Sequence, residues 1–517
     1  MIYEADFVFS PEQLFDRSQV LMAVSRQFGV RVSDVSSYRV VRKSIDARKG
    51  VKYNVRMQVA MHGDFFPDLK GNFEFRDVSS SSSSVTIVGA GPAGYFAALQ
   101  SILLGIKPIV FERGKSVDER KFDIAALNSK YILNPESNYA FGEGGAGTYS
   151  DGKLFTRSKK RGNVTEVLQL LHYFGADEDI LVEAHPHIGT DRLHSIMRNI
   201  RNKILECGGE VHFMSKLTGI KVETNKVRGI VINGTDSYQC ENLILATGHS
   251  ARDIYGLLYN SGVMLREKGF AMGVRVEHPQ ALIDSIQYKR KERGKYLPAA
   301  SYSLVKQVDG RGVYSFCMCP GGRIVSAVTE DQSIVVNGMS NSRRDSCYAN
   351  SGIVVELRPE DYASCSDNKV FSGLEFQRTL ETLAYRNGGG SVVAPAQRLT
   401  DFVFGKVSAS LPSVSYEPGV ISSPMHFWMP EFLSSRLREG FRLFDRQLRG
   451  FLTSEAVVVG VESRTSSPVQ IVRDVDSMRS VSVSNLYPCG EGAGYAGGIV
   501  SSAIDGMEIV KRINQCE

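Results

Sequence analysis

The sequence predicts an α/β fold in which a Rossmann-like domain is split by an inserted α+β domain and preceded by a small α+β module. Three observations predict this arrangement. Residues 85–112 read as an apolar strand, a glycine-rich turn, a helix and a second strand. Residues 485–508 again read as strand, glycine-rich turn and helix. Six consecutive serines, Ser79 to Ser84, are typical of a flexible linker and set apart the residues before them.

The turn after the first strand carries the G-x-G-x-x-G pattern as Gly89, Gly91 and Gly94. In a dinucleotide-binding unit these glycines make the tight turn, let backbone approach a pyrophosphate, and let helix and strand pack closely. The helix N-terminus faces the phosphate charge, and Glu112, after the second strand, accepts hydrogen bonds from a ribose. Gly105 is expected as the left-handed cap that ends the helix. This order of elements predicts a dinucleotide site.

Two further motifs indicate which dinucleotide binds. A late strand leads into Gly490 and Glu491, and a helix begins near Gly497. Residues 242–248 read N-L-I-L-A-T-G. With the first motif, these resemble the glutathione-reductase superfamily of FAD-dependent oxidoreductases. The resemblance implies that the Glu491 carboxylate binds the flavin ribitol and that the following helix points its N-terminus at the isoalloxazine.

Longer stretches narrow the resemblance. Residues 141–153, 187–193, 246–253, 316–322 and 463–468 are together similar to a widespread bacterial family of FAD-dependent or NAD(FAD)-utilizing dehydrogenases. The likeness covers nearly the whole chain and implies non-covalent FAD without implying a substrate. The cofactor contacts predicted from the motifs and the resemblance are Gly89, Gly91, Pro92, Ala93, Gly94, Glu112, Arg113, Gly145, Ala146, Gly147, Ser150, Thr247, Gly248, Gly490, Glu491, Gly498 and Ile499.

The domain organisation follows from shifts in composition. Before the serines, a strand, a helix and two further strands predict a ferredoxin-like or ACT-like module, with Ser10 and Gln13 forming a capping box at the helix start. Its role is regulatory, a docking surface, or a cover for the next domain. The expected divisions are the module (1–78), the serine linker (79–84), the FAD-binding domain (85–255 and 481–517) and an inserted substrate or interdomain module (256–480).

Three residues are candidates for catalysis. Arg464 follows an apolar strand and lies among hydroxyl side chains, which predicts an anion or carbonyl site facing the isoalloxazine. Lys153, beyond the glycine-rich loop of residues 142–152, either places a positive charge near the flavin or is a solvated surface lysine. His249 is either a proton donor at the flavin edge or a packing residue. The loop itself either contacts the flavin, as we expect, or is a mobile surface loop.

The cysteines and histidines have less specific spacing. Cys317 and Cys319 are close enough in sequence to suggest a redox pair. In an extended strand, however, residues two apart point to the same face but lie far from each other, so we expect these cysteines to be inert. His185 and His187 lack a cysteine or acidic partner at useful spacing, so no metal site is predicted.

Composition favours a cytoplasmic enzyme. The chain has 517 residues, of which 42% are hydrophobic, and shows neither a membrane span nor a signal-peptide pattern at its start. Its eight cysteines suit reduced thiols. Basic runs at residues 157–161 and 289–295 raise nucleic acid as a partner, but no aromatic platform accompanies them, so we expect a small-molecule substrate instead.

These observations predict an FAD-binding oxidoreductase, a dehydrogenase or reductase that passes hydride through flavin N5. The sequence shows no second G-x-G-x-x-G strand–turn–helix unit of the kind that a separate NAD(P)H domain carries, so NAD(P)H would dock transiently if it is the electron donor. The alternative is a flavin-binding sensor or scaffold, or an RNA-modifying flavoprotein, that uses the N-terminal module to dock its partner.

Overall fold

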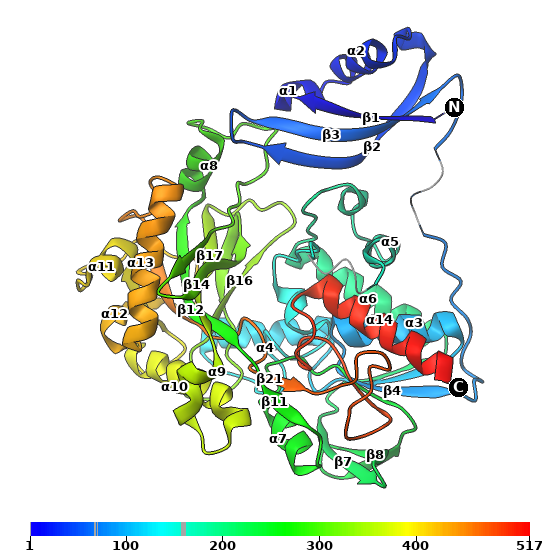
Figure 1. The fold of residues 1–517 in the computed structure, drawn as a ribbon, viewed down its shortest axis with the longest axis vertical. Helices are drawn as coiled ribbons and strands as arrows, with labels where there is room; N and C mark the ends of the chain where they lie inside the picture. Colours follow the sequence, from blue (N-terminus) through cyan, green and yellow to red (C-terminus); the bar gives the residue numbers. More distant parts are fainter. Residues whose placement is uncertain (1, 67–68, 70, 157–161, 517) are drawn as a thin grey trace.

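Three sheets organise the chain in a computed structural model that describes residues 2–66, 69, 71–156 and 162–516 (Figure 1). We call the parts built on them the N-terminal module (residues 2–61), the parallel-sheet domain (residues 84–260 and 486–516) and the inserted domain (residues 265–471). The basic run at 157–161 lies outside the described residues.

The N-terminal module is a three-stranded antiparallel sheet, in the order β1-β3-β2, with two helices packed against it. Every second residue of β3 from Tyr53 to Val59 is buried and shares a core with Val20 and Val24. Ser10 and Gln13 form the predicted capping box. The elements are β1 (Ile2–Phe9), α1 (Pro11–Leu14), α2 (Arg17–Phe28), the 3₁₀ turn η1 (Val32–Asp34), β2 (Val35–Asp46) and β3 (Lys52–Met61).

The serine run, whose composition suggested a flexible linker, is hydrogen-bonded to the parallel-sheet domain, although Ser79, Ser80 and Ser82 are exposed. Ser81 Oγ donates a hydrogen bond to the carbonyl oxygen of Gly105 at 2.8 Å. The backbone of Val78 is tied to Cys207 at 2.7 Å, and Ser84 already begins β4 (Ser84–Val88). The connection from the N-terminal module is therefore made by residues before the serines.

The parallel-sheet domain contains five strands in the order β22-β10-β4-β5-β6, and all neighbours are parallel. Such strands are buried on both faces, which explains why β10 reads as a continuous apolar run and why β4 is buried from Val85 to Val88. The last strand comes from the C-terminal segment. Besides β4, the strands are β5 (Lys107–Phe111), β6 (Glu210–His212), β10 (Leu243–Leu245) and β22 (Leu486–Pro488).

Helices α3 (Pro92–Leu104) and α14 (Ile499–Cys516) run beside each other on this sheet (Figure 1). A Cβ atom at Gly506 would lie 2.1 Å from the carbonyl oxygen of Ala93, so this contact requires glycine. Gly105 ends α3 in the left-handed conformation, as predicted. The domain's other elements are α4 (Val117–Lys130), η2 (Gly145–Tyr149), α5 (Val164–Tyr173), η3 (Glu178–Leu181), α6 (Thr190–Glu206), α7 (Arg252–Asn260) and the antiparallel strands β7 (Leu217–Glu223), β8 (Lys226–Ile232) and β9 (Asp236–Gln239).

The inserted domain is built on a seven-stranded sheet in the order β13-β14-β17-β12-β20-β18-β19. Only its β18–β19 pair is parallel among the described residues. The strands of this sheet are β12 (Phe270–Pro279), β13 (Val305–Val308), β14 (Arg311–Cys319), β17 (Tyr348–Leu357), β18 (Ala394–Arg398), β19 (Val420–Ser422) and β20 (Val457–Glu462).

Two small antiparallel pairs and several helices complete the inserted domain. The pairs are β11 (Leu265–Glu267) with β21 (Val469–Ile471) and β15 (Gly322–Ser326) with β16 (Val336–Ser340). The helices are α8 (Gln280–Tyr288), α9 (Pro359–Tyr362), η4 (Ala363–Cys365), α10 (Lys369–Asn387), α11 (Leu399–Phe404), α12 (Met425–Trp428) and α13 (Glu431–Gln447).

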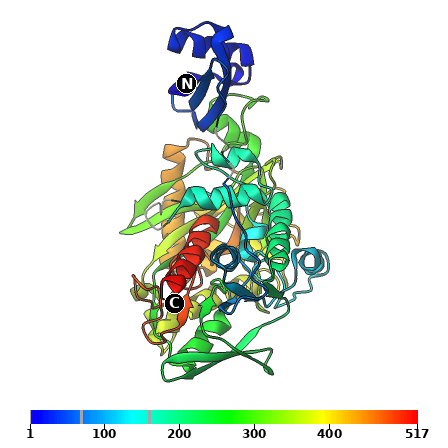
Figure 2. The same cartoon turned by 90° about the vertical axis from the view of Figure 1, so that its right-hand side faces the viewer.

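The N-terminal module stands at one end of the molecule and contacts both other parts (Figure 2). The backbone of Lys43 on β2 exchanges hydrogen bonds with Val182 and Ala184 of the parallel-sheet domain, at 2.8 and 2.9 Å. On the inserted domain, Tyr296 stacks on the ring of Phe15, with 5.3 Å between ring centroids. The module is thus packed on the rest of the protein.

Candidate functional site

A cavity of about 380 Å³ lies between the parallel-sheet domain and the inserted domain. Its walls include residues at the carboxyl ends of β4, β5 and β10, such as Gly89 and Glu112. The opposite wall includes Phe316 and Cys317 of the inserted domain. In open parallel sheets, ligands bind in the crevice outside the carboxyl ends of the strands, so the cavity lies where this fold class holds its ligand.

The three glycines of the first turn have different surroundings. At Gly89, φ is +107° and a Cβ atom would lie 2.3 Å from the Ala246 carbonyl oxygen. A Cβ atom at Gly94 would lie 1.9 Å from the carbonyl oxygen of Gly89. At Gly91, the nearest atom to such a Cβ is the Cα of Gly145, at 3.9 Å. Gly89 and Gly94 are therefore required by the fold, whereas Gly91 keeps space open in the cavity.

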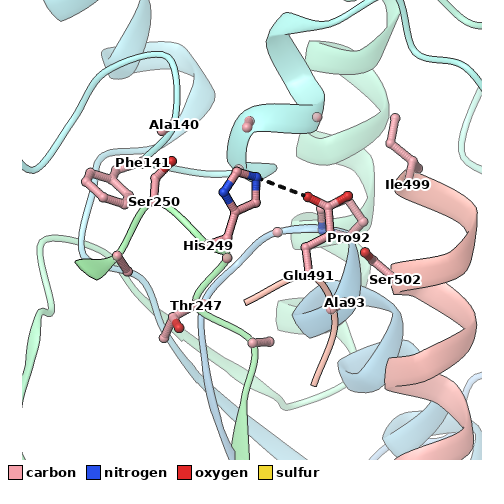
Figure 3. A pocket seen from close by; sticks show the side chains of 18 of the residues that line it. Pro92, Ala93, Ala140, Phe141, Thr247, His249, Ser250, Glu491, Ile499 and Ser502 are labelled. Atoms are coloured by element: carbon pink, nitrogen blue, oxygen red, sulfur yellow. Dashed lines mark ion pairs between the residues drawn. The ribbon is translucent and has the colours of Figure 1, made fainter. Parts of the chain in front are cut away.

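Two helix N-termini reach this cavity. Pro92 and Ala93, in the first turn of α3, line it, as do Ile499 and Ser502 of α14 (Figure 3). The α3 N-cap is Gly91, which has no side chain to satisfy the first N–H groups. Helix N-termini carry partial positive charge and unpaired N–H donors, which favour anionic groups. An elongated dinucleotide with a pyrophosphate and an electron-rich flavin edge fits two such termini in one cavity.

Glu112 lines the cavity, but its carboxylate already accepts hydrogen bonds from three backbone N–H groups. One oxygen accepts from the N–H of Ala90 at 2.8 Å. The other accepts from Gly114 at 2.9 Å and Gly142 at 3.0 Å. The predicted contact between Glu112 and a ribose remains a prediction. In the structure, the Glu112 carboxylate connects the glycine turn to the loop at Gly142.

The glycine-rich loop at residues 142–152 is packed against the protein. It is therefore not the mobile surface loop that was the alternative interpretation of this segment. Glu143, Thr148 and Asp151 are buried within it. The buried guanidinium of Arg120 donates hydrogen bonds to the carbonyl oxygens of Glu143 and Gly145, at 2.8 and 2.9 Å. This loop can therefore present a fixed surface to a ligand.

Glu491 and His249 face each other across the cavity (Figure 3). Their nearest atoms, Glu491 Oε2 and His249 Nε2, are 3.7 Å apart. Burial, with help from the cations of Arg464 and Arg252, lowers the pKa of His249 to about 4, so the ring is neutral at pH 7. Burial also raises the pKa of Glu491 to about 7. Glu491 can therefore bind or release a proton near neutral pH, whereas the His249 ring beside it stays neutral.

Arg464 lines the cavity but is not the free anion clamp that the sequence suggested. Its guanidinium contacts Glu381 at 3.1 and 3.2 Å and donates to Thr329 Oγ1 at 2.6 Å. Glu381 also pairs with Arg252 at 2.7 Å. The charge of Arg464 is therefore compensated within the protein. Lys153 also lines the cavity, and its Nζ donates to the carbonyl oxygen of Met318.

The predicted site residues converge on this one cavity. All of them line it except Gly94 and Gly490, which pack within the fold instead. Sequence reasoning missed Ser215 and Lys216, whose position just after β6 could have indicated them, since they follow a parallel strand. It also missed Asn337, for which we find no sequence signal.

Comparisons with known proteins agree with this site. Residues 269–465 match a family model described as "FAD-dependent protein, C-terminal domain-like". A protein of Clostridium beijerinckii, described as uncharacterized, is 42% identical over 509 residues, which cover 95% of this chain and 94% of that protein. The chain belongs to this family of FAD-dependent proteins. Residues 1–60 match a domain of unknown function.

Other likenesses are more remote. Mitochondrial dihydrolipoyl dehydrogenase of Macaca fascicularis is 25% identical over 189 residues, covering 36% of this chain and 32% of that protein. The chain thus matches about a third of that enzyme's length. Among solved structures, FqzB has a TM-score of 0.38 at 11% identity, covering 87% of this chain and 78% of that one. CtdE in complex with FAD has a TM-score of 0.34 at 11% identity, covering 84% of both chains. Such low scores assign no reaction.

The family model describes an FAD-dependent protein and leaves the reaction open. Within the part of the chain that the structure describes, no cluster of three or more His, Cys, Asp or Glu side chains could hold a metal ion. None of the described helices has both the length and the apolar character needed to cross a membrane.

Proposed function

We propose that this protein is an FAD-dependent dehydrogenase or reductase that transfers hydride between a nicotinamide and a small molecule at the cavity between its two large domains. The observation that carries the proposal is the composition of the cavity wall. The glycine turns of the dinucleotide motif form one side, and polar and thiol side chains of the inserted domain form the other. A cofactor held by the first side would expose its reactive edge to the second.

The residues around the cavity fit the parts of FAD in order. The N-terminus of α3, with the space beside Gly91, would hold the pyrophosphate. Arg113 and Lys216 line the end where the adenosine would lie. The N-terminus of α14 and Glu491 would face the ribitol and isoalloxazine. FAD bound in this way supplies a two-electron hydride acceptor and donor.

The protein's own groups would then manage charge and protons. The positive end of α14 favours negative charge on the adjacent ring edge. Glu491, with its pKa raised to about 7, can hold a proton at Oε2 or release it, beside the neutral ring of His249, whose Nε2 is 3.7 Å away. The His249 side chain is 13% exposed and that of Glu491 32%, so water reaches the pair mainly from the side of Glu491. A nicotinamide would approach from the open side of the cavity and leave after transfer.

Two measurements test the proposal. The purified protein should be yellow and should release FAD on denaturation. Mixing it anaerobically with NADH or NADPH should then bleach the flavin absorbance. Tightly bound NAD without flavin would overturn the cofactor assignment. An FAD-bound protein that neither nicotinamide reduces would overturn the proposed electron donor.

A further inference from the structure

The strand β14 is irregular where it reaches the cavity. Its register against β17 shifts between Phe316 and Cys319. Cys317, within this irregularity, has φ of +44°, a left-handed conformation that residues other than glycine rarely adopt. Cys317 therefore does not continue the regular alternation of the strand, and it lines the cavity. The assumption that these two cysteines lie in a regular extended strand was wrong.

Cys319 lies behind Cys317 and outside the cavity wall. It is completely buried, and its thiol donates a hydrogen bond to the carbonyl oxygen of Cys317 at 3.3 Å. Even in fully extended backbone, Cα atoms two residues apart are at most about 7 Å apart, which is near the upper end of the distance range that a disulfide spans. One thiol thus faces the ligand space while the second is held next to it.

Cations surround this pair. Lys153 donates to the carbonyl oxygen of Met318, between the two cysteines, and Arg275 Nη1 donates to that of Cys317 at 3.3 Å. Contact with the Cys319 thiol, followed by Lys153 and Arg275, lowers the pKa of Cys317 against the opposing effect of burial. The pKa of Cys319 is raised in turn.

Acidic groups also face Cys317, from separate segments. They are Asp151, Glu462 and Glu491. Glu462 is paired with Arg275 at 2.7 Å, and Asp151 is paired with Arg344, so both are neutralised by cations. With these acids neutralised, the charges around the pair favour Cys317 as the thiolate and Cys319 as the thiol. These are the protonation states of an attacking and a resolving cysteine.

We propose that Cys317 and Cys319 form a dithiol–disulfide couple that carries electrons between the bound flavin and a small disulfide substrate. This inference rests on the proposed function and names its substrate class. The Cys317 thiolate attacks one sulfur of the substrate, breaking its S–S bond and releasing the first thiolate. The Cys319 thiol loses its proton and attacks Cys317 Sγ, which releases the second thiolate and leaves a Cys317–Cys319 disulfide.

The electrons and protons of this cycle balance. The substrate disulfide gains two electrons from the Cys317 thiolate and the Cys319 thiol. The Cys319 proton ends on one product sulfur, and the second product thiolate takes its proton from solvent. Two electrons and one proton then restore the thiolate–thiol pair, and they come from NAD(P)H through the bound FAD as the equivalent of one hydride.

The first test measures thiol reactivity in flavin-free protein, so it does not depend on enzyme activity. Iodoacetamide labelling at pH 6 is followed by peptide mass spectrometry, with the exposed Cys347 and Cys365 as internal controls. An ordinary thiol is less than about 1% thiolate at this pH. We expect Cys317 to react at least about tenfold faster than either control. A rate equal to or below theirs would overturn the proposal.

A second test traps the proposed exchange with 5,5′-dithiobis(2-nitrobenzoic acid) as the disulfide probe. In the unmodified sequence, the peptide that carries both cysteines should become lighter by two hydrogens, as an internal disulfide. In Cys319→Ser, Cys317 should keep a thionitrobenzoate adduct. Cys317→Ser should show neither product. An adduct that persists on Cys317 in the presence of Cys319 would contradict the resolving role.

Electron counting connects the couple to the flavin. Anaerobic dithionite titration of fully oxidised, FAD-loaded protein should consume two electrons more per FAD than titration of Cys317→Ser, because a disulfide is a two-electron couple. Equal consumption would overturn the proposal while leaving FAD binding and its reduction by nicotinamide intact. Absence of FAD would defeat the proposed function instead, and the labelling result would still stand.

Discussion

Replacing Glu381 by glutamine tests whether one buried carboxylate holds the wall of the cavity together. Glu381, on α10, is fully buried and contacts two guanidinium groups, those of Arg252 and Arg464. It also accepts a hydrogen bond from Ser463 Oγ at 2.6 Å. Glutamine keeps nearly the same shape but removes the charge, so two buried cations would be left facing each other with less compensation.

The size of the effect follows from the pKa of this carboxyl group. Burial alone would raise it, but Arg464 and Arg252 outweigh burial and lower the pKa of Glu381 to about 2, from an ordinary 4.5. This difference corresponds to about 3 kcal/mol of stability at pH 7. Because the folded-state pKa is lowered, the contribution is complete above the unfolded value and is lost as pH falls toward 2. At pH 3, about 1 kcal/mol should remain.

Urea unfolding at pH 7 and pH 3 measures this difference. The chain has a single tryptophan, Trp428, which lies in the inserted domain and reports its unfolding by fluorescence. Glu375→Gln is the matched control, because Glu375 lies on the same helix in an exposed pair with Arg378 and should change stability by less than about 1 kcal/mol. A loss below about 1 kcal/mol for Glu381→Gln at pH 7, or an equal loss at both pH values, would refute the reasoning.

Three further predictions concern the cavity and the module. Gly91→Val should abolish FAD binding while circular dichroism stays unchanged, since its side chain enters the cavity and meets only Gly145 at contact distance; full FAD occupancy would show that the turn is misassigned. Glu491→Gln should stabilise the flavin-free protein at pH 8 and not at pH 4.5. The raised pKa of Glu491 in the folded protein costs stability only as pH rises from its ordinary value of 4.5 toward 7. Equal shifts of the urea midpoint at both pH values would count against this prediction. Subtilisin should cut first near Phe65, which is 89% exposed, and an initial cut in serines 79–84 would contradict the structure.

The sequence predicted helix ends correctly where the interactions that form them involve neighbouring residues. The capping box of Ser10 and Gln13 and the left-handed cap at Gly105 depend on residues within one helical turn, and both are present. The serine run shows the limit of composition. Six serines are typical of a flexible segment, but Ser81 finds an acceptor in Gly105, which lies in another element. The order of the seven-stranded sheet was equally inaccessible, since it depends on pairing between distant strands such as β12 and β20.

The candidate site was predictable on one side only. The dinucleotide motif named residues that line the cavity because its glycines have fixed steric roles. On the other side, Arg464 was recognised, but its partner Glu381 lies 83 residues away, and no local pattern reveals that its charge is compensated. Cys317 was dismissed because regular strand geometry was assumed, whereas an irregular backbone turns it to the cavity wall.

The position of β22 has a consequence for how the protein is made. The parallel sheet begins with β4 near residue 84, but its edge strand and α14 are synthesised only after the whole inserted domain. A nascent chain that has not reached Leu486 carries the phosphate turn but lacks Glu491 and the helix start at Ile499. Domains fold in the order in which they emerge, so the inserted domain can mature first. Flavin capture would then follow synthesis of the inserted domain, and the bound cofactor would act as a check that the chain has been made through α14.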